Sequence, residues 1–316
     1  MSPSPRTGPA VLAVLGSCLS LQFGAAIAVP LLAELGPGLT TSARLLIAAT
    51  ILLALHRPRV RAWSGAQWRA VLLFGVAMGG MNGFFYAAIA RIPLGIAVTI
   101  EFAGPLVLAA VLSRGRREIA CVVAAAGAIV VLGASGDGIG GDGLDPVGVA
   151  FAAVAAAFWA GYILAGARVG ARVPGNGPLA AGMLVSALVV APFGVGSAGR
   201  LVLEPALLLP LLAVALLASL LPYSLEFVAM RRLPPAVFGV LLALEPVVAG
   251  AAGWALLDQR LSLLEALAML VVVAAAMTQA FGRRPVPETV APARSRSEAD
   301  PSPAREAGRQ PRRPSR

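Results

Sequence analysis

Ten stretches of mostly apolar residues, each about 17–25 residues long, follow one another along this chain of 316 residues. A helix of that length crosses the hydrocarbon core of a bilayer, where only helices and closed barrels satisfy their own backbone polar groups. The stretches lie near residues 10–32, 40–56, 69–90, 93–113, 118–135, 146–167, 177–196, 206–229, 234–257 and 262–281. The pattern predicts an all-α membrane protein with ten transmembrane helices.

The charged residues are few and are concentrated outside these stretches. Hydrophobic residues make up 58% of the chain, charged residues 13%, and the mean hydropathy is +0.84. The net charge of +10 lies in short loops and in the segment 282–316, which is rich in Pro, Arg and Ser without periodicity. This distribution predicts a disordered basic tail and a chain embedded in the lipid bilayer, and it argues against a nucleic-acid partner.

The arginines between the stretches predict the orientation of the chain. With the N-terminal segment 1–9 in the cytoplasm, three arginines fall in exterior loops, namely Arg91, Arg200 and Arg260. Eleven fall in interior loops, namely Arg57, Arg59, Arg61, Arg69, Arg114, Arg116, Arg117, Arg168, Arg172, Arg231 and Arg232. Because cytoplasmic loops are enriched in arginine, we expect both termini in the cytoplasm and a multi-pass protein of the cell inner membrane.

The chain also resembles itself at a shift of 141 residues. At this shift "ARIPLGIAVTIEFAGPLVLAA" aligns with "RRLPPAVFGVLLALEPVVAGA", so that Pro93 meets Pro234 and Pro105 meets Pro246. Five predicted spans in each half require the halves to cross the membrane in opposite directions. We therefore expect two inverted five-helix repeats, 10–135 and 146–281, which is the architecture of secondary transporters.

Two glutamates lie deep inside the repeat-related spans. Glu101 lies four residues before Pro105, and Glu245 directly precedes Pro246. Each proline removes a backbone hydrogen bond and so frees a carbonyl in the same region. An ionised carboxylate at this depth costs roughly 3 kcal/mol or more, and such residues usually face a polar path. We expect both glutamates to line one cavity and at least one to carry a proton, the alternative being a structural ion pair with an arginine.

Further polar residues inside the predicted spans are candidates for the same cavity. Arg44 either faces the cavity and holds a carboxylate or extends outward to the membrane surface. The neutral candidates for binding a polar solute are Gln22, Asn82, Tyr86, Tyr162 and Tyr223. Tyr162 can also be explained by packing alone, and Glu226 by an ion pair with Arg231 or Arg232.

Several segments resemble the EamA family of the drug/metabolite transporter superfamily, and within it the inner-membrane threonine/homoserine exporters. They include "LSLQFGAAIAVPLL", "IPLGIAVTIEFAGPLV" and "LLPYSLEFVAMRRLPPAVFGVLLALEPVVAGAAGWALLDQRLS", and together they cover nearly all of residues 12–281. The resemblance implies a ten-helix inverted-repeat carrier that exports small amino acids in exchange for protons. The alternative is an exporter of another small metabolite or drug with the same fold.

Other classes of function lack the residues that they require. The single histidine, His56, and the two separated cysteines, Cys18 and Cys121, form no metal-ligand pattern, and no catalytic set or cofactor motif is present. We therefore expect no enzyme activity, no metal and no cofactor. The expected partners are a small-molecule substrate, protons and lipid, and a homodimer is left open.

The orientation can be tested with single cysteines in a background that lacks Cys18 and Cys121. We expect an impermeant thiol reagent to label Gly140→Cys in intact cells and to leave Thr289→Cys unlabelled until the cells are opened. Labelling of Thr289→Cys but not of Gly140→Cys in intact cells would reverse the topology.

Overall fold

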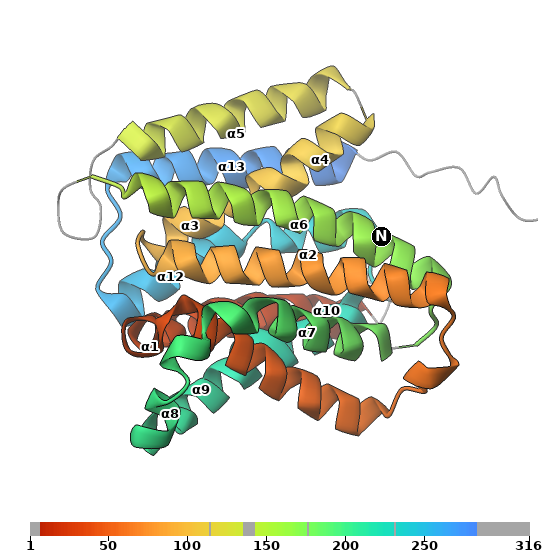
Figure 1. Ribbon diagram of the computed structural model, residues 1–316. Coiled ribbons are helices and arrows are strands. Elements are labelled where there is room, and N and C mark those ends of the chain that lie inside the picture. The colour runs from red at the N-terminus through yellow and green to blue at the C-terminus, as the bar shows by residue number, and fades with distance from the viewer. Residues whose placement is uncertain (1–6, 114, 135–142, 176, 231, 283–316) are drawn as a thin grey trace, which may run out of the picture. The chain divides into compact units, whose positions relative to one another are not determined.

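The computed structural model describes residues 7–113, 115–134, 143–175, 177–230 and 232–282 (Figure 1), and these ranges contain helices and no strand. The expectation of an all-α protein is confirmed. Gly140, Thr289 and the tail after Gly282 lie outside the described residues.

The longer helices account for most of the apolar sequence. They are α1 (Thr7–His56), α2 (Gly65–Ile89), α5 (Arg116–Ala134), α6 (Pro146–Arg172), α7 (Gly177–Val190) and α13 (Leu263–Gly282). The shorter α-helices are α3 (Leu94–Glu101), α4 (Ala103–Ser113), α8 (Arg200–Leu203), α9 (Leu208–Ala215), α10 (Leu221–Met230), α11 (Pro235–Leu242) and α12 (Glu245–Leu257). Short 3₁₀ segments lie at Val60–Ala62, Ala191–Phe193, Val195–Ser197 and Pro205–Leu207, and a π-helical turn lies at Leu216–Leu220.

Among the described residues, seven helical segments are long and apolar enough to cross a membrane, or eight if one pair bent by 72° counts as a single span. The chain is therefore a multi-pass membrane protein. The count of ten spans arranged as two inverted repeats stays a prediction.

Helix α1 covers both of the first two predicted spans and is kinked between them. Gly36 has φ 77° and ψ 159°, which are not helical values. Proline disfavours a helical ψ in the residue before it, and glycine alone adopts a positive φ without a steric penalty. The Gly36–Pro37 pair therefore turns the chain within the predicted loop 33–39.

The two spans that carry the paired prolines are both interrupted. Helix α3 ends at Glu101 and α4 begins at Ala103, whereas α11 ends at Leu242 and α12 begins at Glu245. The bounds of α11 are those of α3 shifted by 141 residues, and the prolines that precede them have the same backbone conformation, with φ near −56° and ψ 141°. The interruptions follow from prolines that cannot donate a backbone hydrogen bond.

Helix α3 lies at the centre of the packing, because all eight of its residues are buried. It contacts α6, α12 and α13. A Cβ atom at Gly95 would lie 2.8 Å from the Cα atom of Gly250, so the backbones of α3 and α12 meet without side chains between them. Helices with small residues at the contact approach closely in this way in membranes. The packing of α3 therefore determines the position of Glu101 inside the helix bundle.

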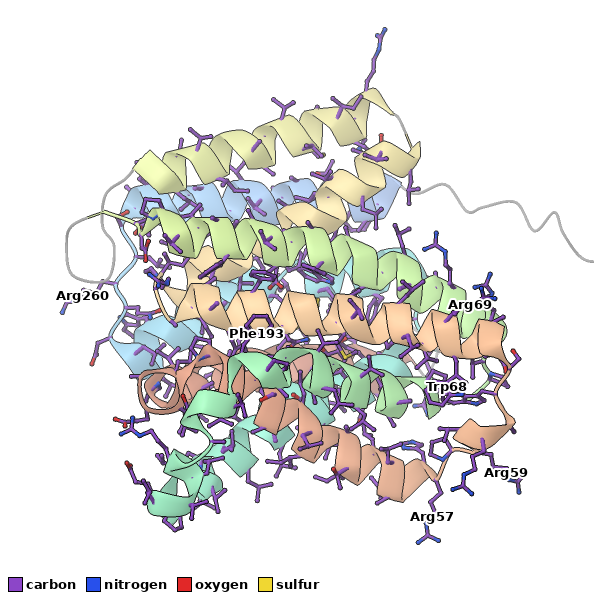
Figure 2. All side chains as sticks on the ribbon, in the orientation of Figure 1. Arg57, Arg59, Trp68, Arg69, Phe193 and Arg260 are labelled. Atoms are coloured by element: carbon purple, nitrogen blue, oxygen red, sulfur yellow. The ribbon has the colours of Figure 1, made fainter. Side chains whose placement is uncertain are left out.

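Large apolar side chains cover the outer faces of the bundle. Leu73 of α2 is 62% exposed, Val130 of α5 is 69% exposed and Phe281 of α13 is 70% exposed. Exposure of such faces to water would be unfavourable, whereas lipid tails are as apolar as the side chains themselves. Arg57, Arg59 and Arg69 lie together at one end of the molecule, and Arg260 lies at the opposite end (Figure 2).

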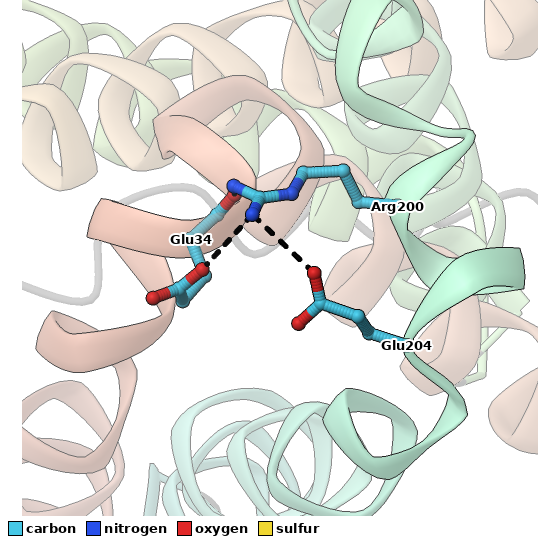
Figure 3. A network of polar contacts seen from close by, with 3 residues as sticks. All are labelled: Glu34, Arg200 and Glu204. Atoms are coloured by element: carbon cyan, nitrogen blue, oxygen red, sulfur yellow. Dashed lines mark hydrogen bonds and ion pairs between the residues drawn. The ribbon is translucent and has the colours of Figure 1, made fainter.

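Two exposed ion-pair groups connect helices at the polar ends. Arg200 contacts the carboxylates of Glu34 and Glu204, each at 3.3 Å, and so joins α1 to α8 (Figure 3). Exposed pairs of this kind contribute about 0–1 kcal/mol, so they orient the ends more than they stabilise the fold.

The second group joins the loop after α2 to the first residues of α6. Arg91 bonds Asp145 at 2.8 Å, and Asp145 also accepts the backbone N–H of Val147 as the N-cap of α6. The Arg91 hydrogen bond lowers the pKa of the Asp145 carboxyl, followed by the bond from Val147. A lowered folded-state pKa means that this contribution to stability is present above the unfolded pKa, about 3.9, and is lost as the pH falls below it.

Replacement of glycine by alanine is expected to have opposite effects on stability at Gly104 and at Gly127. A Cβ atom at Gly104 would lie 2.0 Å from the carbonyl oxygen of Ala156, whereas one at Gly127 would meet nothing within 4 Å. We expect Gly104→Ala to destabilise the protein by about 1–3 kcal/mol, because α4 must move away from α6. Gly127→Ala should raise stability by up to about 1 kcal/mol through helix propensity. Thermal unfolding in one detergent measures both, and equal unfolding temperatures would contradict the packing described here.

Candidate functional site

The candidate site is built around the buried guanidinium group of Arg44, whose side chain extends into the protein instead of to the membrane surface. Arg44 lies in the second arm of α1 and is 1% exposed. Its Nη1 donates to the Ala218 carbonyl oxygen at 3.0 Å and to the Ser219 hydroxyl at 2.5 Å. Its Nη2 donates to the side-chain oxygen of Asn82, and its guanidinium carbon lies 4.2 Å from the centre of the Tyr86 ring. No carboxylate pairs with Arg44 among the described residues.

The carbonyl that Arg44 uses is made available by the sequence of the neighbouring segment. Pro222 lies four residues after Ala218 and cannot donate to its carbonyl oxygen, so this acceptor has no helical partner from that position. The same segment forms the π-helical turn Leu216–Leu220, a widened geometry that is frequent at functional sites. Ser219, in the same turn, supplies the second acceptor. The local sequence thus gives this transmembrane helix two oxygen acceptors for the guanidinium group of Arg44.

Asn82 links Arg44 to the other half of the chain. Its amide nitrogen donates to the Met78 carbonyl at 2.9 Å and to the Tyr223 hydroxyl at 3.5 Å, which leaves its oxygen for Arg44. Asn82 and Tyr223 are separated by 141 residues, the same shift that relates α3 to α11. Equivalent positions of the two predicted repeats therefore meet beside Arg44.

Three of the predicted site residues carry a buried polar atom that has no hydrogen-bond partner within the described part of the chain. These atoms are Arg44 Nε, Tyr86 Oη and Gln22 Oε1. A buried polar atom without a partner costs about 1–3 kcal/mol.

The two predicted carboxylates lie at the edges of the helix interruptions. Glu101 is the last residue of α3, and Glu245 is the first residue of α12. Both are buried, being 9% and 5% exposed. The Cys18 sulfur of α1 lies 4.0 Å from Glu245 Oε1, and no described side chain hydrogen-bonds Glu101.

Glu226 has a neutral partner. It accepts a hydrogen bond from Ser17 at 2.7 Å and makes no ion pair with Arg232, while Arg231 lies outside the described residues. Ser17 also contacts the carbonyl of Pro222 at 3.3 Å. Sequence reasoning missed Ser17, Ala218 and Ser219, although Pro222 was a usable signal for the free carbonyl of Ala218.

Tyr162 makes no hydrogen bond with this group of residues among the described contacts. Its ring stacks on Phe74 with the centroids 5.0 Å apart, in the packing between α6 and α2. Tyr223 is partly buried in the same apolar cluster but reaches Asn82 through its hydroxyl. The structure thus brings Arg44, Asn82, Tyr86 and Tyr223 into contact, and their role in binding stays a prediction.

Comparison with known proteins shows to which family this chain belongs. The model of the EamA-like transporter family matches residues 146–279. The threonine/homoserine exporter RhtA of Escherichia coli K12 is 37% identical over 267 residues, which cover 84% of this chain and 90% of that protein. RhtA of Salmonella typhimurium SL1344 is 36% identical over 278 residues, or 88% of this chain and 93% of that protein.

The chain belongs to the EamA-like transporter family. The resemblance seen in the sequence is confirmed, and the family is one of transporters. A crystal structure with 23% sequence identity has the same fold, with a TM-score of 0.54 over 88% of this chain and 96% of the other.

The hydrogen bonds of Arg44 predict that another residue with a positive charge cannot replace it. Arg44→Lys keeps the positive charge but replaces the planar fork with a single amine, which cannot reach Ala218, Ser219 and Asn82 from separate nitrogens. We expect a loss of about 1–3 kcal/mol in unfolding free energy, because buried acceptors lose their donors.

The matched control is Arg59→Lys, in an exposed loop, where the change should stay within about 0.5 kcal/mol. Thermal unfolding in detergent compares the two variants. Equal unfolding temperatures for Arg44→Lys and Arg59→Lys would contradict the hydrogen-bond network.

Proposed function

We propose that this chain exports small amino acids of the threonine/homoserine type across the cell inner membrane, in exchange for protons. The family and the two RhtA relatives, which match this chain over most of its length, support the amino-acid substrate. A group of buried polar and charged residues supports an exchange mechanism; it consists of the Arg44 network and of Glu101 and Glu245 at two helix interruptions. That group is the observation that carries the proposal.

The residues around Arg44 suit the carboxylate of an amino acid. Arg44 Nε is buried without a partner among the described residues, and the guanidinium plane is fixed by Asn82 and Ser219. A planar guanidinium binds a carboxylate with two parallel hydrogen bonds. Tyr86 Oη and Gln22 Oε1 are further buried atoms that need a partner. They would bond the polar parts of the substrate.

The carboxylates would bind the ammonium group of the substrate or a proton, but not both. An empty site holds a proton on Glu101 or Glu245, because an unpaired ionised carboxylate is costly inside the membrane. An amino acid that enters from the cytoplasm places its ammonium group there and displaces the proton. Mutually exclusive occupancy couples the outward movement of substrate to the inward movement of protons.

The two interrupted helices would allow the site to open to each side in turn. In this proposal residues 10–135 and 146–281 are inverted repeats that rock against each other, and the site lies where they meet. The equal bounds of α3 and α11 at the 141-residue shift support the repeat. Both termini lie in the cytoplasm, as the arginine distribution predicts.

The proposal predicts that a proton gradient drives efflux through the carboxylates. Purified protein in vesicles loaded with threonine should release it faster when the outside is acidic, and Glu101→Gln or Glu245→Gln should reduce this gradient-driven efflux at least tenfold. Glutamine has nearly the shape of glutamate but cannot exchange a proton. Glu34→Gln, which changes an exposed carboxylate, should transport as the wild type does.

Two results would contradict the proposal. Wild-type efflux of threonine and homoserine no faster than from protein-free vesicles would contradict the substrate class. Unchanged gradient-driven efflux in both the Glu101 and the Glu245 variants would contradict the coupling mechanism.

A further inference from the structure

A groove on the membrane-facing side of the bundle lies between α2 and α6, which run side by side (Figure 1). Its volume is about 450 Å³. Leu73 and Val76 of α2 and Phe158 of α6 form its walls. Small residues form its floor: a Cβ atom at Gly161 would lie 3.9 Å from the Cβ atom of Ala77. The apolar lining fits a hydrocarbon chain.

One end of the groove is strongly basic. Arg168 and Arg172 line it, and both are exposed. The side chain of Gln67 donates to the Arg172 carbonyl at 2.8 Å, which holds this end of α6 beside the start of α2. Arg69 lies at the same end of α2, as Figure 2 shows.

No acid neutralises these two arginines within the described residues. Neither α2 nor α6 contains aspartate or glutamate. The ion pairs of the described part of the chain are made by Arg91 and Arg200. The groove therefore combines an apolar channel with an uncompensated positive end, and a neutral occupant would leave that charge unused.

The length of the groove matches one leaflet of a bilayer. Ala157 lines its far end, and Arg168 lies eleven residues further along α6. Eleven residues of helix rise about 16 Å, close to half of the roughly 30 Å hydrocarbon thickness. A lipid whose acyl chain reached Ala157 would have its headgroup at Arg168.

We propose that this groove binds an anionic membrane phospholipid, with an acyl chain along the groove and the phosphate on Arg168 and Arg172. A guanidinium binds phosphate oxygens with directed hydrogen bonds as well as by charge. A second hollow, of about 310 Å³ between α4 and α5, is lined only by apolar residues such as Val107 and Ile119. It offers a lipid no polar contact for the headgroup, so we expect selection by charge in the α2–α6 groove and not in this second hollow.

Native mass spectrometry of the purified protein tests the site with phosphatidylglycerol and with phosphatidylcholine of the same acyl chains. We expect the wild type to retain phosphatidylglycerol preferentially. Arg168→Gln with Arg172→Gln should weaken phosphatidylglycerol binding about thirtyfold, equivalent to about 2 kcal/mol, and weaken phosphatidylcholine binding much less, because the choline cation of that lipid already offsets its phosphate charge. Ala157→Trp fills the groove and should weaken retention of both lipids.

Matched variants separate the site from a general effect of charge or bulk. Arg59→Gln with Arg61→Gln removes the same charge from an exposed loop, and Ala153→Trp adds the same bulk to α6 outside the groove; both should retain the lipid as the wild type does. Equal retention of the two lipids by the wild type would overturn the proposal. So would wild-type retention in the Arg168/Arg172 variant, or an equal loss in the Arg59/Arg61 variant.

Discussion

The requirement that a buried guanidinium have acceptors determines how the centre of this protein is arranged. A charge inside the membrane costs roughly 3 kcal/mol or more unless polar groups surround it. Arg44 is fully buried and obtains those groups from two other segments, the π-helical turn and α2. The second arm of α1, the turn at Ala218 and the middle of α2 are thereby fixed to one another, and Asn82 extends the network to Tyr223.

The interrupted helices carry two buried carboxylates inside apolar segments that are long enough to span a membrane. Helix α3 brings Glu101 to its last position and α12 begins with Glu245, at interruptions that coincide under the 141-residue shift. Irregular backbone at membrane depth persists only where protein or a polar cavity surrounds it. Two buried carboxylates and one buried guanidinium group are the chemical complement of a zwitterion, which is why the proposal assigns an amino acid to this protein.

The sequence predicted the parts of this arrangement that depend on local rules. The paired prolines indicated where helical hydrogen bonds would be missing, the Gly36–Pro37 pair lies in a predicted loop, and the family was identified from its segments. The partners of Arg44 could not be predicted, because they come from residues far along the chain whose approach depends on packing. Glu226 accepts a hydrogen bond from Ser17, a contact that could not be predicted for the same reason, and makes no ion pair with Arg232. Tyr162 was a candidate for the cavity, but its ring stacks on Phe74, since an aromatic ring packs as readily as it binds a solute.

Proton linkage to substrate binding tests the central claim most directly. Calorimetry of threonine binding to the purified protein, in buffers of equal pH and different ionisation enthalpies, measures how many protons leave when the substrate enters. The account predicts a net release, so that the heat of binding changes with the buffer, because the ammonium group displaces a proton from the carboxylates. Threonine binding with the same heat in every buffer would contradict the account.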